Sequence, residues 1–232
     1  MNDVALITGA SAGIGTAIAR EWARQQRGPL VLTARRAQAL HQLAEELQSR
    51  HGCSCTVLPA DLTEPSAPAA LMQQLHERGL RCRWLINNAG FGRRGAFDTD
   101  ARAAQLAMLQ LNCGALTALS HLALPDLRAS RGGICNVAST AAFQPGPWMS
   151  VYYATKAYVL SFSEGLRHEL RGSGVAVSCC CPGPTHTEFA GTADMEETPM
   201  FRYAAMPADR VARAALRGLD RNRAIVIPGL GN

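Results

Sequence analysis

The sequence predicts a doubly wound α/β fold in which about seven mostly parallel strands carry helices on both faces. Short apolar or β-branched runs alternate with longer stretches of helical periodicity. Most of the runs are apolar throughout, which is typical of strands that are covered on both faces. Alternation repeated this often favours a parallel sheet with right-handed crossovers. Because no linker, repeat or low-complexity segment interrupts the 232 residues, we predict one domain over residues 1–232.

The predicted elements follow from these patterns in chain order. We place strands at 4–7, 30–33, 56–58, 84–86, 133–137, 175–180 and 224–227. Leucines at helical spacing predict helices around 40–48 and 71–75, and two longer patterns cover 101–124 and 150–171. Residues 184–206 hold Pro, Gly, Thr, Met and Phe with weak periodicity. A segment of this kind inside a compact domain is usually functional, so we predict an irregular substrate loop there.

The composition excludes several classes of protein. The net charge is +5, but the arginines are scattered, so no basic run typical of nucleic-acid binding is present. The first residues lack the features of a secretion signal, and no uninterrupted apolar stretch approaches the ~18 residues of a membrane span. We expect a cytoplasmic protein without a nucleic-acid or membrane partner.

The eight cysteines do not have the spacing of a metal site. No CxxC pair occurs, and the consecutive Cys179, Cys180 and Cys181 would point alternately to opposite faces of a strand. We predict that they are small buried strand residues, and we predict no metal.

A glycine-rich loop follows the first strand and opens a helix. Gly9 permits a sharp turn, Gly13 a close approach to a ligand, and Gly15 tight packing of the helix on the sheet. The start of a helix offers free N–H groups and a partial positive charge to a pyrophosphate. We therefore expect dinucleotide contacts from the loop residues Gly9, Ser11, Ala12, Gly13, Ile14 and Gly15.

The end of the second strand indicates which dinucleotide binds. A site for NAD places an acid there to accept from the ribose 2′-hydroxyl. This chain has Arg35 and Arg36 instead, and a guanidinium suits a 2′-phosphate. We predict NADP(H) as the cofactor.

Two further segments lie where the edge of a parallel sheet binds ligands. Asp61, followed by Leu62, comes after the third strand, and its carboxylate can accept from an adenine amino group. Asn88, Ala89 and Gly90 follow the fourth strand. Both segments are predicted to contact the cofactor.

Tyr152 and Lys156 are four residues apart in a helical pattern and share one face. Lys156 is the single lysine among 23 Lys and Arg residues. A free tyrosine has a pKa of about 10, and a nearby ammonium favours the phenolate, so we expect Tyr152 to act as an acid/base. Ser139 can hold a substrate oxygen near the tyrosine. Asn112 interrupts an apolar helix, where it fixes a water beside Lys156 or satisfies a kink.

Together these motifs resemble the short-chain dehydrogenase/reductase family in its compact one-domain form, which has a Rossmann-like fold. Residues 8–15 resemble its TGxxxGIG loop, residues 87–90 its NNAG motif, and Pro182 and Gly183, followed by Thr185 and Thr187, its PG motif beside the nicotinamide. The resemblance covers nearly the whole chain. Its catalytic tetrad matches, in order and spacing, Asn112, Ser139, Tyr152 and Lys156.

The resemblance implies roles for these residues. Tyr152 would be the acid/base, Lys156 would bind the nicotinamide ribose and lower the tyrosine pKa, and Ser139 would orient the carbonyl. Asn112 would hold a proton-relay water. Members usually form dimers or tetramers through the helices predicted at 101–124 and 150–171. Many NADP-preferring members have a basic residue where this chain has Ala12, so the cofactor prediction depends on the two arginines.

We therefore predict an NADP(H)-dependent oxidoreductase that transfers a hydride between the nicotinamide and a small-molecule carbonyl or secondary alcohol. The alternative is a catalytically silent NADP(H)-binding regulatory protein, but a sensor needs no acid/base. An epimerase or dehydratase is disfavoured because it usually needs a second substrate domain. Candidates for an apolar substrate pocket are Phe91, Phe143, Pro145, Trp148, Phe189 and residues 195–201.

Overall fold

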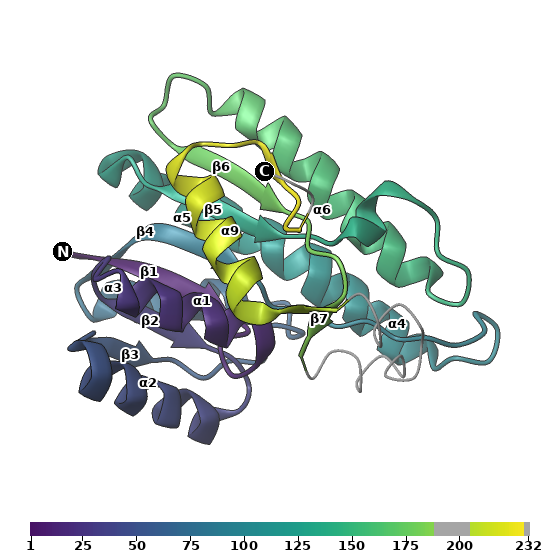
Figure 1. The fold of residues 1–232 in the computed structure, drawn as a ribbon, viewed down its shortest axis with the longest axis horizontal. Helices are drawn as coiled ribbons and strands as arrows, with labels where there is room; N and C mark the ends of the chain where they lie inside the picture. Colours follow the sequence, from purple (N-terminus) through teal and green to yellow (C-terminus); the bar gives the residue numbers. More distant parts are fainter. Residues whose placement is uncertain (188–204, 230–232) are drawn as a thin grey trace.

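The computed structural model describes residues 1–187 and 205–229, which are organised around a seven-stranded sheet of order β3-β2-β1-β4-β5-β6-β9. Every neighbouring pair of its strands is parallel, which confirms the predicted fold class (Figure 1). The strands are β1 Asn2–Thr8, β2 Leu30–Thr33, β3 Cys55–Val57, β4 Leu80–Asn87, β5 Gly133–Val137, β6 Ala176–Cys180 and β9 Ile225–Val226.

Both faces of the sheet are covered, which explains the continuous apolar runs. Along β1, Ala5 and Ile7 belong to one core cluster, whereas Val4 and Leu6 belong to the other. Successive strand residues point to opposite faces, so a strand between two helical layers is apolar at each position.

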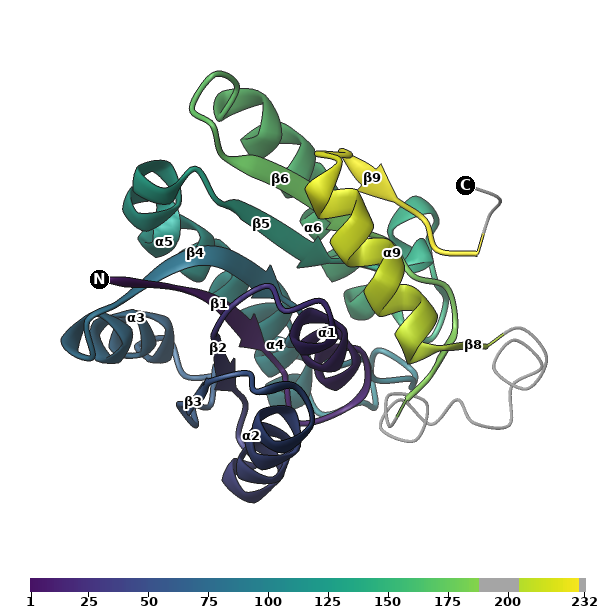
Figure 2. The same cartoon turned by 60° about the vertical axis from the view of Figure 1, so that its left-hand side comes forward.

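The helices form one layer on each side of the sheet (Figure 2). One core cluster lies beneath α1 Gly13–Arg24, α2 Ala37–His51 and α9 Ala208–Asp220. The clusters on the other face lie beneath α3 Ala67–Glu77, α5 Leu116–Ser130 and α6 Ser150–Glu169. The chain leaves β1 toward β2 and leaves β4 toward β5, in opposite directions along the sheet. The carboxyl ends of these two strands are therefore the position where doubly wound sheets bind ligands.

The prediction of one uniform helix over 101–124 is wrong in two respects. The helix divides into α4 Arg102–Leu109, a π-helical turn at Gln110–Ala115 and α5. It also continues to Ser130, because Pro125 lies on the exposed side, where water can satisfy the carbonyl freed by the missing N–H.

The same run, Arg102–Ser130, is long and apolar enough to cross a membrane by length and composition alone, with a mean hydropathy of 1.2 over its most apolar window. Single core helices of soluble proteins pass the same test. Leu119, Ala123 and Leu127 of this run belong to the core cluster on β4 and α3, so packing against the sheet accounts for much of its hydrophobicity.

The two ends of the predicted irregular segment 184–206 pair with each other as short strands. β7 Thr185–His186 pairs in parallel with β8 Met206–Pro207. Residues 188–204 lie outside the described residues, and so do Phe189 and residues 195–201 of the predicted substrate pocket.

The consecutive cysteines are buried, as predicted. Cys179 and Cys181 face the layer of α6, whereas Cys180 faces the layer of α1 and α9. All eight cysteines are free thiols.

Candidate active site

The glycine loop brings the start of α1 against the end of β1. Gly9 has a φ of 65°, in the left-handed region that the predicted sharp turn requires. A Cβ added to Gly15 would lie 2.3 Å from the Gly9 carbonyl oxygen, so only glycine lets the helix approach this closely. The first turn of α1 has no acidic residue, and Ala12 at its N-cap makes no side-chain hydrogen bond. Its N–H groups and dipole therefore suit an anion.

A hydroxyl and an amide connect this loop to β4. Thr8 Oγ1 accepts hydrogen bonds from the backbone N–H groups of Asn88 and Ala89, both at 2.9 Å. In return, Asn88 Nδ2 donates to the Thr8 carbonyl at 2.9 Å. These bonds fix the ends of the two strands between which a dinucleotide would lie. We predicted no such role for Thr8 from the sequence.

The two arginines after β2 lie at one end of the cavity. Arg36 donates from Nε to Ser11 Oγ at 3.3 Å and from a terminal nitrogen to the Ser11 carbonyl at 3.1 Å, so it is tied to the glycine loop. Arg35 lines the same cavity, and its charge acts on the Asp61 carboxylate.

Asp61 orders the turn after β3. Its Oδ1 accepts from the Thr63 backbone N–H at 3.0 Å and from the Thr63 hydroxyl at 2.7 Å. Burial opposes the charged form, but the hydrogen bonds from Thr63 and the charge of Arg35 outweigh it, so the pKa of Asp61 lies below its ordinary value. The carboxylate is therefore ionised at neutral pH and can accept from a ligand.

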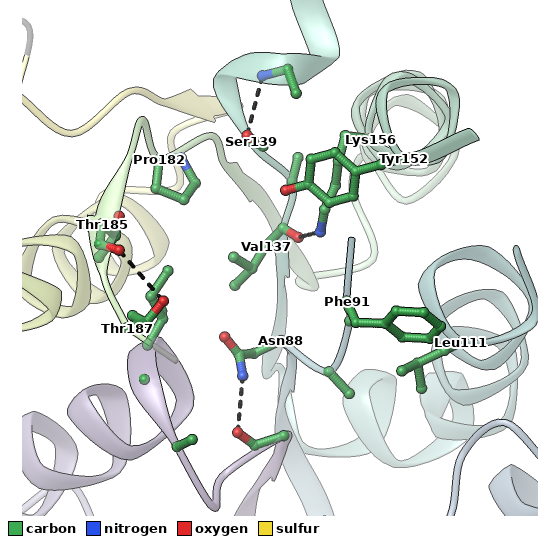
Figure 3. A pocket seen from close by; sticks show the side chains of 18 of the residues that line it. Asn88, Phe91, Leu111, Val137, Ser139, Tyr152, Lys156, Pro182, Thr185 and Thr187 are labelled. Atoms are coloured by element: carbon green, nitrogen blue, oxygen red, sulfur yellow. Dashed lines mark hydrogen bonds between the residues drawn. The ribbon is translucent and has the colours of Figure 1, made fainter. Parts of the chain in front are cut away.

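Helix α6 presents Tyr152 and Lys156 to the cavity, as their spacing predicted (Figure 3). Lys156 Nζ donates to the Val137 carbonyl at 2.9 Å and lies 5.8 Å from the centre of the Tyr152 ring. Ser139 follows β5 and caps a 3₁₀ turn at Thr140–Phe143, because its Oγ accepts from the Ala141 N–H at 3.1 Å.

The pKa values of these groups differ from the sequence-based expectation. Burial raises the pKa of Tyr152 to about 12, and the hydrogen bond with Ser139 reverses only part of this effect. Burial lowers the pKa of Lys156 to about 8. In the protein alone, desolvation therefore outweighs the attraction between the ammonium and a phenolate, so the pKa of Tyr152 is raised before a cofactor binds.

The Asn112 side chain connects two segments that carry residues of the site. Its Oδ1 accepts from the Phe91 N–H at 3.1 Å, and its Nδ2 donates to the Phe91 carbonyl at 2.9 Å and to Thr155 Oγ1 at 3.0 Å. Thr155 Oγ1 then donates to the Tyr152 carbonyl at 2.7 Å. The amide thus joins the loop after β4 to the helix that carries the tyrosine, and these bonds fully occupy its two donors, which leaves no side-chain N–H for the predicted water.

One cavity of about 490 Å³ collects nearly all predicted site residues. Gly15 and Asn112 do not line it. Across from Tyr152 and Lys156, the segment after β6 supplies Pro182, Thr185 and Thr187 (Figure 3). The predicted residues that line the cavity are Gly9, Ser11, Ala12, Gly13, Ile14, Arg35, Arg36, Asp61, Leu62, Asn88, Ala89, Gly90, Ser139, Tyr152, Lys156, Pro182, Gly183, Thr185 and Thr187.

The apolar lining was predicted less well. Phe91 lines the cavity, but Pro145 does not. The prediction is also wrong for Phe143 and Trp148, which are 50% and 61% exposed and do not line the cavity. Leu111, Ala141, Met149 and Tyr153 do line it and were missed.

Residues 3–198 match the family of short chain dehydrogenases. The chain therefore belongs to the short-chain dehydrogenase/reductase family, as its motifs indicated, and it is an oxidoreductase by that membership.

Similar proteins show the range within this family. Sulfoacetaldehyde reductase 2 from Chromohalobacter salexigens is 38% identical over 193 residues, which cover 82% of this chain and 75% of the relative. A short-chain dehydrogenase from Sphingobium yanoikuyae, solved in complex with NADPH, is 39% identical with a TM-score of 0.90 and covers 100% of this chain and 89% of its own. A bulky-bulky ketone specific alcohol dehydrogenase from Comamonas testosteroni is 33% identical with a TM-score of 0.85 and covers 100% and 88%.

Proposed function

We propose that this protein is an NADP(H)-dependent oxidoreductase that interconverts a carbonyl compound and a secondary or primary alcohol. The observation that carries the proposal is the shared cavity, which has an anion-binding helix start at one end and the Tyr152 hydroxyl at the other. The relatives named for sulfoacetaldehyde and for bulky ketones mark two classes of carbonyl substrate.

The residues of the cavity fit NADP(H). The glycine loop and the start of α1 would hold the pyrophosphate, Asp61 the adenine, and Lys156 the nicotinamide ribose. Arg35 and Arg36 offer guanidinium groups to a 2′-phosphate at the place where an NAD site uses an acid. When bound, the reduced cofactor supplies the hydride that the carbonyl carbon accepts.

Tyr152 is suited to be the acid of the reduction. Its raised pKa keeps the hydroxyl protonated at neutral pH, so it can donate a proton to the carbonyl oxygen as that oxygen gains negative charge. Ser139 lies beside Tyr152 and can donate a hydrogen bond to the same oxygen, which holds the carbonyl in place.

Replacing Tyr152 with phenylalanine tests this assignment. The Tyr152→Phe variant is expected to bind NADPH with wild-type affinity and to lose at least ~100-fold in kcat, the usual contribution of a positioned acid. Tyr158→Phe is the matched control, because Tyr158 lies on the same helix with its hydroxyl bonded to Thr117 outside the cavity. Turnover of Tyr152→Phe near that of the control would contradict the mechanism.

Cofactor preference is tested separately. NADPH and NADH binding are measured side by side in the wild type and in Arg35→Ala. We expect a preference for NADPH that falls by about tenfold or more in the variant, because a charge-assisted hydrogen bond contributes about 1.5–3 kcal/mol. Equal binding of the two cofactors by the wild type would contradict NADP(H) preference.

We also propose that the protein forms a homodimer or homotetramer through α4, α5 and α6. The outward side of these helices carries Leu106, Leu109 and Tyr158, which are 56%, 41% and 42% exposed. An apolar surface of this kind favours association. Light scattering should give a mass of two or four chains, and a monomer at micromolar concentration would refute this proposal.

A further inference from the structure

One continuous apolar cluster forms the wall of the cavity around Tyr152. Met108, Ala141, Met149 and Tyr152 are buried together, and Phe91 and Tyr153 pack against them. All of these except Met108 also line the cavity. The surface beside the reactive hydroxyl is therefore apolar and partly aromatic, which favours the apolar part of a ligand.

The aromatic part of this wall is held in place. Tyr153 stands edge-on to Tyr152, with the ring centres 6.0 Å apart and an angle of 79° between the planes. The Tyr153 ring also packs on Gly146, where an added Cβ would come within 2.3 Å of the ring atoms. Because Tyr152 and Gly146 confine the ring, the part of Tyr153 that lines the cavity is held in place, and aromatic rings pack well against such a surface.

Among the described residues that line the cavity, the positive charges are Arg35, Arg36 and Lys156, and only Lys156 lies near Tyr152. Arg35 and Arg36 are at the adenosine end, and the Lys156 ammonium is bonded to the Val137 carbonyl. On the loop after β4, Arg93 is held by Asp100 through bonds of 2.7 Å and 3.0 Å and does not line the cavity. Within the part of the chain that the structure describes, the apolar cluster around Tyr152 therefore offers no positive charge to a sulfonate or carboxylate next to the reacting carbonyl.

We infer that the site acts on neutral carbonyl compounds that carry an aryl or similarly broad apolar group, in preference to aldehydes that carry an anionic group beside the carbonyl. This inference rests on the proposed function. A buried anion without a partner loses its hydration with little compensation, whereas an apolar ring gains free energy from the same burial.

Two aldehydes that differ in one substituent test the inference. Phenylacetaldehyde and sulfoacetaldehyde both carry a CH₂ group next to the carbonyl, and they differ in phenyl against sulfonate. With NADPH and the wild-type protein, we expect kcat/KM to be at least ~100-fold higher for phenylacetaldehyde, from burial of about 100 Å² of ring surface together with the desolvation of the anion.

Variants of the apolar residues that line the cavity give a second test, through the KM for phenylacetaldehyde. Phe91→Ala and Met149→Ala are expected to raise the KM for phenylacetaldehyde by about tenfold, with unchanged NADPH affinity. Phe97→Ala is the matched control for Phe91, because Phe97 is 71% exposed on the same loop and does not line the cavity. Wild-type KM values in both wall variants would overturn the inference.

The outcomes separate the inference from the function on which it rests. Equal or faster reduction of sulfoacetaldehyde would overturn the inference and leave the proposed oxidoreductase function intact. NADPH binding without reduction of either aldehyde would overturn the inference, and NADPH binding without reduction of any aldehyde or ketone in a wider panel would overturn the proposed function as well.

Discussion

Replacing Gly15 with alanine tests how closely α1 must approach the end of β1. The added Cβ would lie 2.3 Å from the Gly9 carbonyl oxygen and 2.6 Å from Asn88 Nδ2, whereas ordinary contacts begin at 3.4 Å. The start of α1 would therefore have to move by about 1 Å away from the loop. Neither neighbour can yield easily, since one is backbone and the other is bonded to Thr8.

This displacement has a predictable magnitude. Overpacking costs about 1–3 kcal/mol, and each kcal/mol lowers the Tm of a chain of this size by roughly 2–4 °C. The moved helix start also presents its N–H groups less well to a pyrophosphate. We expect the Kd for NADPH to rise at least ~10-fold, equivalent to about 1.4 kcal/mol. Titration of NADPH fluorescence and thermal unfolding measure the two effects.

Gly165→Ala provides the control. Gly165 lies inside α6, and nothing lies within 4 Å of its added Cβ. The alanine should leave NADPH affinity unchanged and stabilise the helix by about 0.5–1 kcal/mol. Wild-type affinity and Tm in Gly15→Ala would refute the reasoning about this contact.

Further predictions concern the reacting end of the cavity and the effect of removing metal ions. Thr155→Val removes the hydroxyl between Asn112 and the Tyr152 carbonyl, so kcat should fall about tenfold at unchanged NADPH affinity. Thr155→Ser should restore kcat. Equal kcat in both variants would argue against a role for this hydrogen-bond chain in positioning Tyr152. For carbonyl reduction, kcat/KM should be constant below and decline above pH 8, because Lys156 loses its charge as the pH rises through its pKa of about 8 while Tyr152 stays protonated. Alcohol oxidation should instead rise with pH, because Tyr152 must lose its proton, and parallel profiles in the two directions would contradict these assignments. EDTA should leave activity unchanged, since no group of three potential metal ligands occurs among the described residues, and a loss restored by added metal would disprove this.

The strands and the main motifs were predictable because their signals are local. The predicted bounds of β2 and β5 agree with the structure at both ends, since each strand is buried along its whole length and follows a turn-forming residue, Pro29 or Gly132. The glycine loop and the pair of Tyr152 and Lys156 follow equally from short spacings.

Features that depend on distant residues were not predictable. The π-helical turn at Gln110–Ala115 interrupts a helix whose sequence periodicity hardly changes, and Asn112 was its one local signal. The hydrogen bond between Asn112 and Thr155 joins residues 43 positions apart. Phe143 and Trp148 resembled pocket residues by type, but a loop without periodicity does not reveal which side chains face solvent.

The direction of the Tyr152 pKa in the protein alone was not predictable for a related reason. Spacing shows that a lysine is near, but the depth of burial decides whether attraction or desolvation dominates. Burial at this position depends on Met149, Ala141 and Phe91, which come from three separate segments of the chain.

The most direct test of the central claim follows the hydride itself. The protein is incubated with phenylacetaldehyde or a panel of other aldehydes and ketones, and with NADPH that carries deuterium at nicotinamide C4, on either face in separate reactions. We predict an alcohol with deuterium on its carbinol carbon from one of the two labelled cofactors, and almost none when Tyr152→Phe replaces the wild type. Tight NADPH binding without deuterium in any alcohol would contradict the claim and identify the protein as a catalytically silent NADP(H)-binding protein.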